Sequence, residues 1–391
     1  MKFILYAWGS NSDNILRDSL IELGYVVSIF EYKCEHYTRD LNMANCLINC
    51  IHEENADAVI SFDYFPIISM VCNTIGIVYY SWVYDCPHYS LFAKTTGYGC
   101  NKIGCFDKVL VDRLNTLGID TVVHVPLGVS WPNFVKKNKR YRCDISFVGS
   151  LYTGEYDYYD KIISDKVLKQ KVDECVVKQC FNYTEDHSSS FWRTDKRDRD
   201  LRLDERVYKI LSDNELLPGE EYFEDIEYIF NSSFLEKKVT IEERRALLRG
   251  ITKLDCDFSL YTGSDLSDEP LLKKHSKGYV DYNGVMPLVF AQSRINLNIT
   301  LRSIKSGIPL RALDIMGCGG FLLSNYQEEL AEYFIENEEL VMFYSYEDCM
   351  EKINYYLSHE DERSEIAQAG RRAVKERFDF KRQLEKLLGG K

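Results

Sequence analysis

The sequence lacks several features that would assign its class at once. Its 13 cysteines form no C-x-x-C pair, and no apolar run reaches the roughly 20 residues that span a bilayer. The short apolar opening leads into polar Gly9, Ser10 and Asn11, which is not the pattern of a secretion signal. These absences argue against a disulfide framework, a structural zinc site and a transmembrane segment, and they predict a cytoplasmic protein with reduced thiols.

An excess of positive charge is also absent. Lys and Arg number 48 against 61 Asp and Glu, so the formal net charge is -13. Such a chain repels nucleic acid and anionic membranes, which excludes both as main partners, although a local basic site can still bind a small anion. The length of 391 residues and the 45% hydrophobic content favour two or three domains with sizeable cores.

The first 130 or so residues alternate short apolar runs with amphipathic segments. We predict helices at 14–23, 41–54 and 67–74, and strands at 2–8, 25–32, 58–62, 77–83, 108–112 and 122–126. This alternation is typical of a parallel sheet with helices on both faces. In such sheets, ligands bind beyond the carboxyl ends of the strands.

A second α/β unit follows a basic segment at 136–140, which we interpret as a solvated linker or, alternatively, a phosphate-binding patch. Its predicted strands are 143–149, 258–261, 295–299, 321–323 and 340–343, interrupted by a polar, largely helical insert at about 152–251. Thr240 and Glu243 predict a capped helix start, as do Ser345 and Asp348. Two such units fit transferases, binding proteins and dehydrogenases equally.

The segment from Asn296 to Asn325 carries the strongest chemical signal. A strand leads into a polar loop and then a helix, whose free first amides and positive dipole end favour an anion. We predict a diphosphate site at Arg302, Lys305, Ser306, Gly307, Ile308, Pro309, Leu310 and Arg311. Asp314 shares a face with Arg311 one turn deeper, where a carboxylate can accept from two ribose hydroxyls. The alternative is an ordinary strand-loop-helix with Asp314 as a surface carboxylate.

Three stretches of this segment, N-L-N-I-T, S-G-I-P-L-R and L-D-I-M-G-C-G-G-F-L-L, resemble the C-terminal domain of CgeB-type (spore-maturation-like) glycosyltransferases. More distantly they resemble glycosyltransferase family 4. Asp314 matches the glutamate that holds the nucleotide ribose in that family, and Ser306 stands where the wider family has a second glutamate. Further similar stretches are His124–Val129, Phe147–Ser150 and Tyr279–Tyr282.

The resemblance covers roughly 120–150 and 255–385, and it implies the α/β GT-B fold of two Rossmann-like domains that face a cleft. The expected units are an acceptor-side domain at 1–135, a nucleotide-sugar-binding domain at 136–370 with the helical insert, and a C-terminal helix at 371–391 that crosses back to the first domain. It also adds expected donor contacts outside the segment, at Gly149, Ser150, Tyr152, Tyr279 and Val280.

Two loops after predicted N-terminal strands are candidates for the acceptor side. The first, with Gly9, Ser10, Asn11 and Asp13, is not a G-x-G-x-x-G loop, which makes a dehydrogenase improbable. In the second, Asp85 and His88 among aromatic residues could bind a sugar and transfer a proton, so we predict them as catalytic. The alternative interpretation is a proline turn with a capped carboxylate.

These observations predict a glycosyltransferase, a hexosyl- or N-acetylhexosaminyltransferase, that moves a sugar from a nucleotide sugar to a protein or glycan. UDP is the expected nucleotide. No D-x-D pair follows a strand in the 296–325 segment, so we expect no metal, and no cofactor beyond the donor substrate. Whether the anomeric centre is inverted or retained stays open. The alternative function is a non-catalytic GT-B-like module that binds a nucleotide or glycan.

Overall fold

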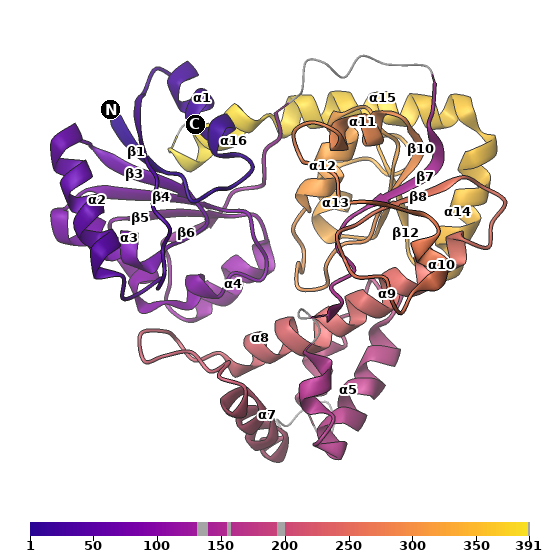
Figure 1. Ribbon diagram of the computed structural model, residues 1–391, viewed down its shortest axis with the longest axis horizontal. Helices are drawn as coiled ribbons and strands as arrows, with labels where there is room; N and C mark the ends of the chain where they lie inside the picture. Colours follow the sequence, from indigo (N-terminus) through magenta and orange to yellow (C-terminus); the bar gives the residue numbers. More distant parts are fainter. Residues whose placement is uncertain (131–139, 155–157, 194–199, 390–391) are drawn as a thin grey trace.

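The computed structural model describes residues 1–130, 140–154, 158–193 and 200–389, and Figure 1 shows two sheets side by side with a helical insert below them. Apart from Arg140, the basic segment at 136–140 lies outside the described residues. The N-terminal sheet has the order β2-β1-β3-β4-β5-β6, with all neighbours parallel. Its strands are β1 (Lys2–Tyr6), β2 (Val26–Phe30), β3 (Ala58–Phe62), β4 (Val78–Val83), β5 (Asn101–Cys105) and β6 (Val122–His124).

Helices α1 (Asp13–Glu22), α2 (Leu41–Glu54), α3 (Pro66–Ile75) and α4 (Lys108–Thr116) connect these strands. Strand β3 is buried at every position, as expected for a central strand covered on both faces. The predicted strand at 108–112 is wrong: these residues begin α4, because Asp107 caps the helix by accepting from the Leu110 amide at 3.2 Å. Strand β5, which precedes this cap, was not predicted.

The C-terminal sheet is also fully parallel, with the order β12-β11-β10-β7-β8-β9. Its strands are β7 (Cys143–Val148), β8 (Phe258–Tyr261), β9 (Ser276–Gly278), β10 (Ser293–Asn298), β11 (Leu322–Asn325) and β12 (Val341–Phe343). Its helices are α10 (Pro270–Lys273), α11 (Met286–Ala291), α12 (Leu310–Gly317), α13 (Glu328–Tyr333), α14 (Tyr346–Ser358) and α15 (Glu360–Arg377). The predicted cap at Ser345 is confirmed, since its side chain accepts from the Asp348 amide at 3.1 Å.

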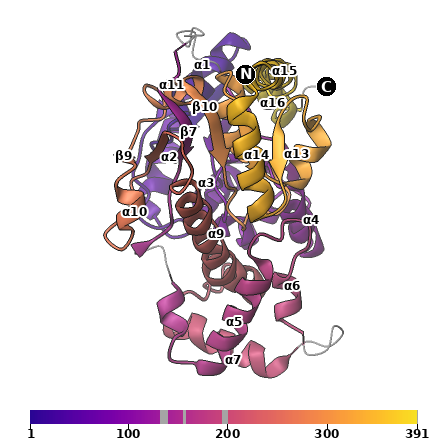
Figure 2. The same cartoon turned by 90° about the vertical axis from the view of Figure 1, so that its right-hand side faces the viewer.

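The insert has an apolar core of its own. The helices of the insert are α5 (Lys166–Gln179), α6 (Ser188–Phe191), α7 (Leu201–Asp213), α8 (Ile226–Phe230) and α9 (Glu236–Ile251). The predicted helix start at Thr240 is wrong: a π-helical turn at Asn231–Leu235 links α8 directly to α9, and Thr240 lies buried inside α9. Figure 2 shows α9 running from the insert up to the C-terminal sheet, where it contacts α14.

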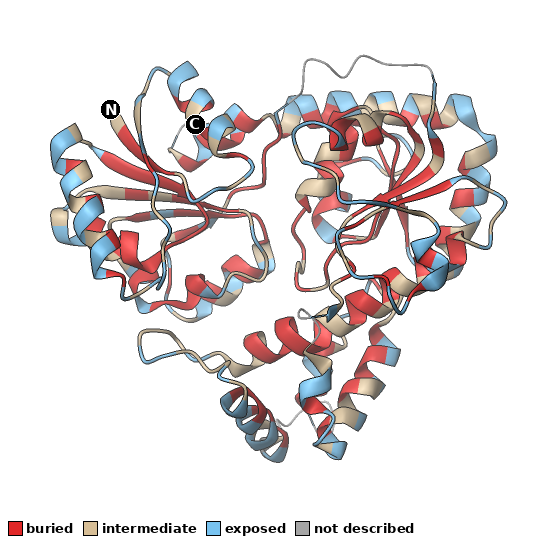
Figure 3. Ribbon diagram, in the orientation of Figure 1, coloured by how far each residue is buried: buried red, intermediate tan, exposed pale blue. Residues whose placement is uncertain are grey.

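The buried strands of both sheets stand out in Figure 3. After α15, helix α16 (Phe380–Leu387) returns to the N-terminal sheet, where Phe380 and Leu384 pack in the same cluster as Phe3 and Trp82. This packing ties the end of the chain to the sheet at its beginning. Among the helices of the described ranges, none is long and apolar enough to cross a membrane.

Candidate functional site

Helix α12 points its N-terminus toward the carboxyl ends of β7, β8 and β10. The helix begins at Leu310, after Pro309, so its first amides have no partner within the helix. Five predicted donor residues line one cavity of about 720 Å³ in this region: Gly149, Ser150, Tyr279, Val280 and Arg311. Ile308 is buried and Leu310 half-buried in the adjoining apolar cluster, where they seat the helix. The cavity therefore combines a helix terminus, a glycine turn and a guanidinium.

Asp314 lies one turn deeper and lines a neighbouring cavity of about 290 Å³. Tyr282 and Met286 line both cavities, so the two share part of their walls. The Tyr282 hydroxyl donates to Asp314 Oδ1 at 2.9 Å, and the Arg311 guanidinium lies 3.8 Å from Oδ2. Oδ2 has no hydrogen-bond partner among the described residues. Burial raises the pKa of Asp314 to about 6, against the opposing effects of Arg311 and Tyr282.

Three other predicted donor residues lie apart from this cavity. Arg302 is half-buried, makes a two-pronged ion pair with the buried Glu243 and lies over the Tyr183 ring. Lys305 pairs with Glu236 at 2.5 Å and Asp186 at 3.2 Å. Both positively charged side chains are thus paired with carboxylates of the insert, which leaves little of their charge for a diphosphate.

The third, Ser306, lies at the contact between the two α/β units. Its hydroxyl lies 3.1 Å from Asp107 and donates to Glu329 at 2.8 Å. The next residue, Gly307, lies so close to Phe106 that an added Cβ atom would stand 2.7 Å from the Phe106 ring. The glycine and serine of this motif therefore join the domains, a role that the sequence motif alone did not suggest.

Arg244 of α9 was not predicted, yet it reaches the same strand ends. Its guanidinium donates to the carbonyl oxygens of Ile299 and Ser150 and lies over the ring of Tyr152, 4.9 Å from the centroid. The side chain is buried, and burial lowers its pKa. No carboxylate among the described residues forms an ion pair with it, so this buried cation, on which Glu243 acts only at longer range, faces the Gly149 turn.

On the N-terminal sheet, two carboxyl groups meet where the adjacent strands β3 and β4 end. Asp63 Oδ1 accepts from the amides of Tyr84 at 3.0 Å and Asp85 at 3.1 Å. Burial raises the pKa of Asp85 to about 6, and the negative charge of Asp63 adds to this rise. Asp85 is thus a carboxylate that exchanges a proton near neutral pH. Asp63 was missed, although it follows a predicted, mostly apolar strand as Asp85 does.

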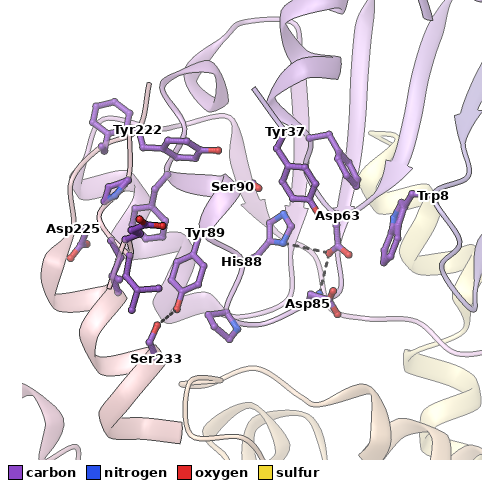
Figure 4. Close-up of a pocket in the computed structure, with 18 residues that line it drawn as sticks. Trp8, Tyr37, Asp63, Asp85, His88, Tyr89, Ser90, Tyr222, Asp225 and Ser233 are labelled. Carbon is purple, nitrogen blue, oxygen red and sulfur yellow. Dashed lines mark hydrogen bonds and ion pairs between the residues drawn. The ribbon is translucent and has the colours of Figure 1, made fainter. Parts of the chain in front are cut away.

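His88 faces this pair and not open space. Its Nε2 lies 3.0 Å from the Tyr64 amide nitrogen and 3.2 Å from the Tyr64 carbonyl oxygen, and its Nδ1 lies 4.0 Å from Asp63 Oδ1 (Figure 4). The backbone of Tyr64 therefore holds the ring in place. This geometry places His88 against the Asp63 carboxylate at the end of β3.

The first loop is divided between two surroundings. Asn11 lines the cavity with Arg311, and its carbonyl accepts from Asn283 at 3.4 Å. Gly9, Ser10 and Asp13 line a different hollow beside β2, where the Gly9 amide donates to Asp13 at 3.1 Å. The structure thus brings only Asn11 of the four predicted residues next to the C-terminal site. Within the described ranges, no group of His, Cys, Asp and Glu is arranged to hold a metal.

Known proteins resemble the chain both in sequence and in fold. Residues 243–389 match a family model described as glycosyl transferase-like. A comparison with curated proteins found no match. A glycosyltransferase from Rickettsia africae superposes with a TM-score of 0.53 at 13% identity, covering 99% of this chain and 97% of that one.

Two further solved structures are similar over nearly their whole length. Sucrose-phosphate synthase from Thermosynechococcus elongatus has a TM-score of 0.57 at 9% identity, covering 100% of this chain and 98% of its own. Anabaena HepE in complex with UDP and glucose has a TM-score of 0.51 at 9% identity, covering 100% and 99%. The chain therefore has the GT-B fold of glycosyltransferases, as its sequence predicted.

Proposed function

We propose that the protein is a glycosyltransferase that takes its donor, a UDP-linked sugar, in the C-terminal half. The observation that carries this proposal is Asp314, a buried carboxyl with one unpartnered oxygen, one turn below a helix tip that faces a cavity. The glycosyl transferase-like match covers this helix. Anabaena HepE, which shares the fold, is described in complex with UDP and with UDP-glucose.

In this proposal each part of the donor has its own partner. The ribose hydroxyls donate to Asp314, and the base lies by Tyr279 and Val280, which line the larger cavity. The diphosphate lies between the α12 terminus, the Gly149–Ser150 turn and Arg311, with Arg244 behind the turn. Negative charge that builds up on the leaving diphosphate is then stabilised by guanidinium groups and amides, so transfer needs no metal ion.

The acceptor enters from the side of the N-terminal sheet. Its hydroxyl oxygen attacks the anomeric carbon, the bond to the diphosphate breaks, and Asp85 takes the hydroxyl proton. Tyr84 connects the two sites: its hydroxyl donates to the carbonyl of Gly128, which lines the Asp314 cavity, and its backbone amide donates to Asp63. A single residue, Tyr84, therefore links the acceptor-side carboxylate Asp63 to the wall of the cavity that Asp314 lines.

The proposal is tested by thermal unfolding with UDP, GDP, dTDP, CMP and ADP, comparing wild type with Asp314→Ala. A nucleotide at about 100 times its dissociation constant stabilises the folded state by about 2.7 kcal/mol, a shift of several degrees. We expect UDP to shift the wild type and not Asp314→Ala. Asp361→Ala, an exposed carboxyl on α15, should respond like the wild type.

The absence of any shift from all five nucleotides would contradict the donor site. An equal shift in Asp314→Ala would contradict the role of that carboxyl. The second arm measures UDP release from UDP-glucose, UDP-galactose and UDP-N-acetylglucosamine with a mixed glycan acceptor. UDP binding without release in any combination would favour the non-catalytic module.

A further inference from the structure

A cavity of about 520 Å³ lies between the N-terminal sheet and the insert, above the carboxylate pair (Figure 4). The sheet side contributes ten residues and the insert eight. The insert side is formed by the chain between α7 and α9: Glu215, Leu216, Pro218, Tyr222, Phe223, Asp225, Ile229 and Ser233. The same cavity contains Asp85 and His88, so the insert forms a wall of the site proposed for the acceptor.

The insert is fastened to the N-terminal sheet at this wall. The Phe223 amide donates to the Phe92 carbonyl at 2.7 Å, and the Lys94 amide donates to the Glu221 carbonyl at 2.8 Å. The two segments thus pair as in a short antiparallel bridge. Arg113 of α4 makes a two-pronged ion pair with Asp225 at 2.7 Å. These backbone and ionic contacts fix the wall in place, so its shape is part of the folded site.

The lining of the cavity has an unusual balance of groups. Seven of its residues are aromatic: Trp8, Tyr37, Phe65, Tyr89, Phe92, Tyr222 and Phe223. Four carry carboxyl groups: Asp63, Asp85, Glu215 and Asp225. Figure 4 shows Trp8 and Tyr37 on one side of His88 and Tyr89 and Tyr222 on the other, so aromatic side chains lie on both sides. Among the described residues that line it, none is a lysine or arginine.

This balance selects a chemical class. Aromatic rings offer apolar faces with defined geometry to the C–H face of a sugar ring, and carboxylates accept from its hydroxyls. A carboxylate or phosphate on the ligand would meet Asp63, Asp85 and Glu215, and the Arg113 guanidinium behind Asp225 is already paired with that carboxylate; such a charge is unfavourable inside a low-dielectric cavity. The cavity therefore suits a polyhydroxylated ring without negative charge.

We propose that the insert completes the acceptor site and that the acceptor presents an uncharged pyranose to it. This inference rests on the proposed function and names the substrate class of its second site. In this arrangement Tyr222 contributes a ring from the insert, while the carboxylate pair on the sheet binds the hydroxyl that is to be glycosylated. The insert thus determines which acceptors the enzyme accepts.

The test is a binding titration on the full chain, followed by intrinsic fluorescence, since Trp8 lines the cavity. The ligands are methyl hexopyranosides, methyl N-acetylhexosaminides and their uronic-acid counterparts, without UDP. We expect at least one neutral glycoside to bind, with its uronic-acid counterpart at least about 10-fold weaker. The Tyr222→Ala variant should weaken the neutral ligand by about 3–10-fold, and Tyr222→Phe should restore it.

The control is Tyr208→Ala, an exposed tyrosine on α7 that does not line the cavity. Equal binding of the uronic acid, unchanged affinity in Tyr222→Ala, or no binding of any neutral glycoside would each overturn the inference. A separate UDP titration distinguishes the two proposals. If the wild type binds UDP but no neutral glycoside, this inference alone is contradicted, whereas absent UDP binding by the wild type contradicts the proposed function.

Discussion

The proposed donor side lies within the C-terminal unit and has two of its charged residues on one helix, whereas the proposed acceptor side draws on parts of the chain more than 200 residues apart. Arg311 and Asp314 share α12, but Trp8, Asp85 and Tyr222 meet only through the docking of the insert. The two sides also differ in charge. A buried guanidinium that forms no ion pair among the described residues stands on the proposed donor side, and the carboxyls of Asp63 and Asp85 stand together on the proposed acceptor side.

This difference in charge matches the chemistry proposed for each side. A nucleotide diphosphate is an anion, so the donor side gathers amides and arginines at a helix terminus. An acceptor hydroxyl must lose a proton, so the acceptor side keeps a carboxyl whose pKa lies near 6 through burial and a second carboxylate. Changes on one side should therefore leave binding on the other side intact.

The largest expected effect is on the acceptor side. Asp85→Asn removes the proposed proton acceptor and should lower kcat by about 10²–10⁴-fold, while UDP affinity stays at the wild-type value. Initial rates of UDP release and a UDP titration measure the two quantities. Asp120→Asn, an exposed carboxyl beyond α4, is the matched control. A kcat within threefold of wild type would show that Asp85 is not the base.

The next effect belongs to the donor side. Arg244→Gln keeps a donor for the carbonyls of Ser150 and Ile299 but removes the buried charge. We expect UDP affinity to fall about 10–100-fold, the value of a charge-assisted hydrogen bond, with uridine affinity unchanged. The control is Arg249, which lies on the same helix as Arg244 and pairs with Glu269. The Arg249→Gln variant should retain both affinities. Equal losses for UDP and uridine would show that Arg244 only supports the fold.

The pH dependence separates the sides again. The pKa values of Asp85 and Asp314 are both raised to about 6, so each is ionised above that pH and protonated below it. With saturating donor, kcat should fall about tenfold for each pH unit below 6 as Asp85 is protonated. UDP affinity should fall over the same range through Asp314, and Asp314→Asn should abolish only the second dependence. A kcat that is flat from pH 5 to 7 would contradict the assignment of Asp85.

The smallest effect concerns the wall between the sides. Arg113→Ala breaks the partly buried ion pair with Asp225 and should lower the free energy of unfolding by about 1–2 kcal/mol. Acceptor affinity should fall with it, and UDP affinity should not. Arg206→Ala breaks a more exposed pair with Asp165 inside the insert and should cost less than about 1 kcal/mol in urea unfolding. Equal effects would mean that the wall is not held by Arg113.

The sequence was most informative where one element carries several functions. The apolar runs predicted β3 and β8 to the residue, and the proline and glycines around α12 predicted its bounds. It failed at residues 108–112, because a β-branched start to α4 reads as a strand until the cap at Asp107 is recognised. The insert was predicted as helical, but nothing in its composition indicated which sheet it would contact.

The site residues could be predicted from the sequence only where neighbouring positions on one element form the site. Arg311 and Asp314 are neighbours on one helix, so their spacing predicted a shared face. Arg302 and Lys305 carry the same charge as Arg311, but tertiary contacts pair them with Glu243 and Glu236. These partners lie 59 and 69 residues away, so a local motif cannot indicate them. Arg244 escaped prediction for the same reason, since its role depends on where α9 packs.

A crystal structure of the protein with UDP tests the central claim most directly. The account predicts the ribose hydroxyls within hydrogen-bond distance of Asp314, the diphosphate between the α12 terminus and the Gly149–Ser150 turn, and the base beside Tyr279 and Val280. The cavity between the insert and the N-terminal sheet should stay free for the acceptor. UDP bound in that cavity, or bound without contact to Asp314, would contradict the assignment of the two sides.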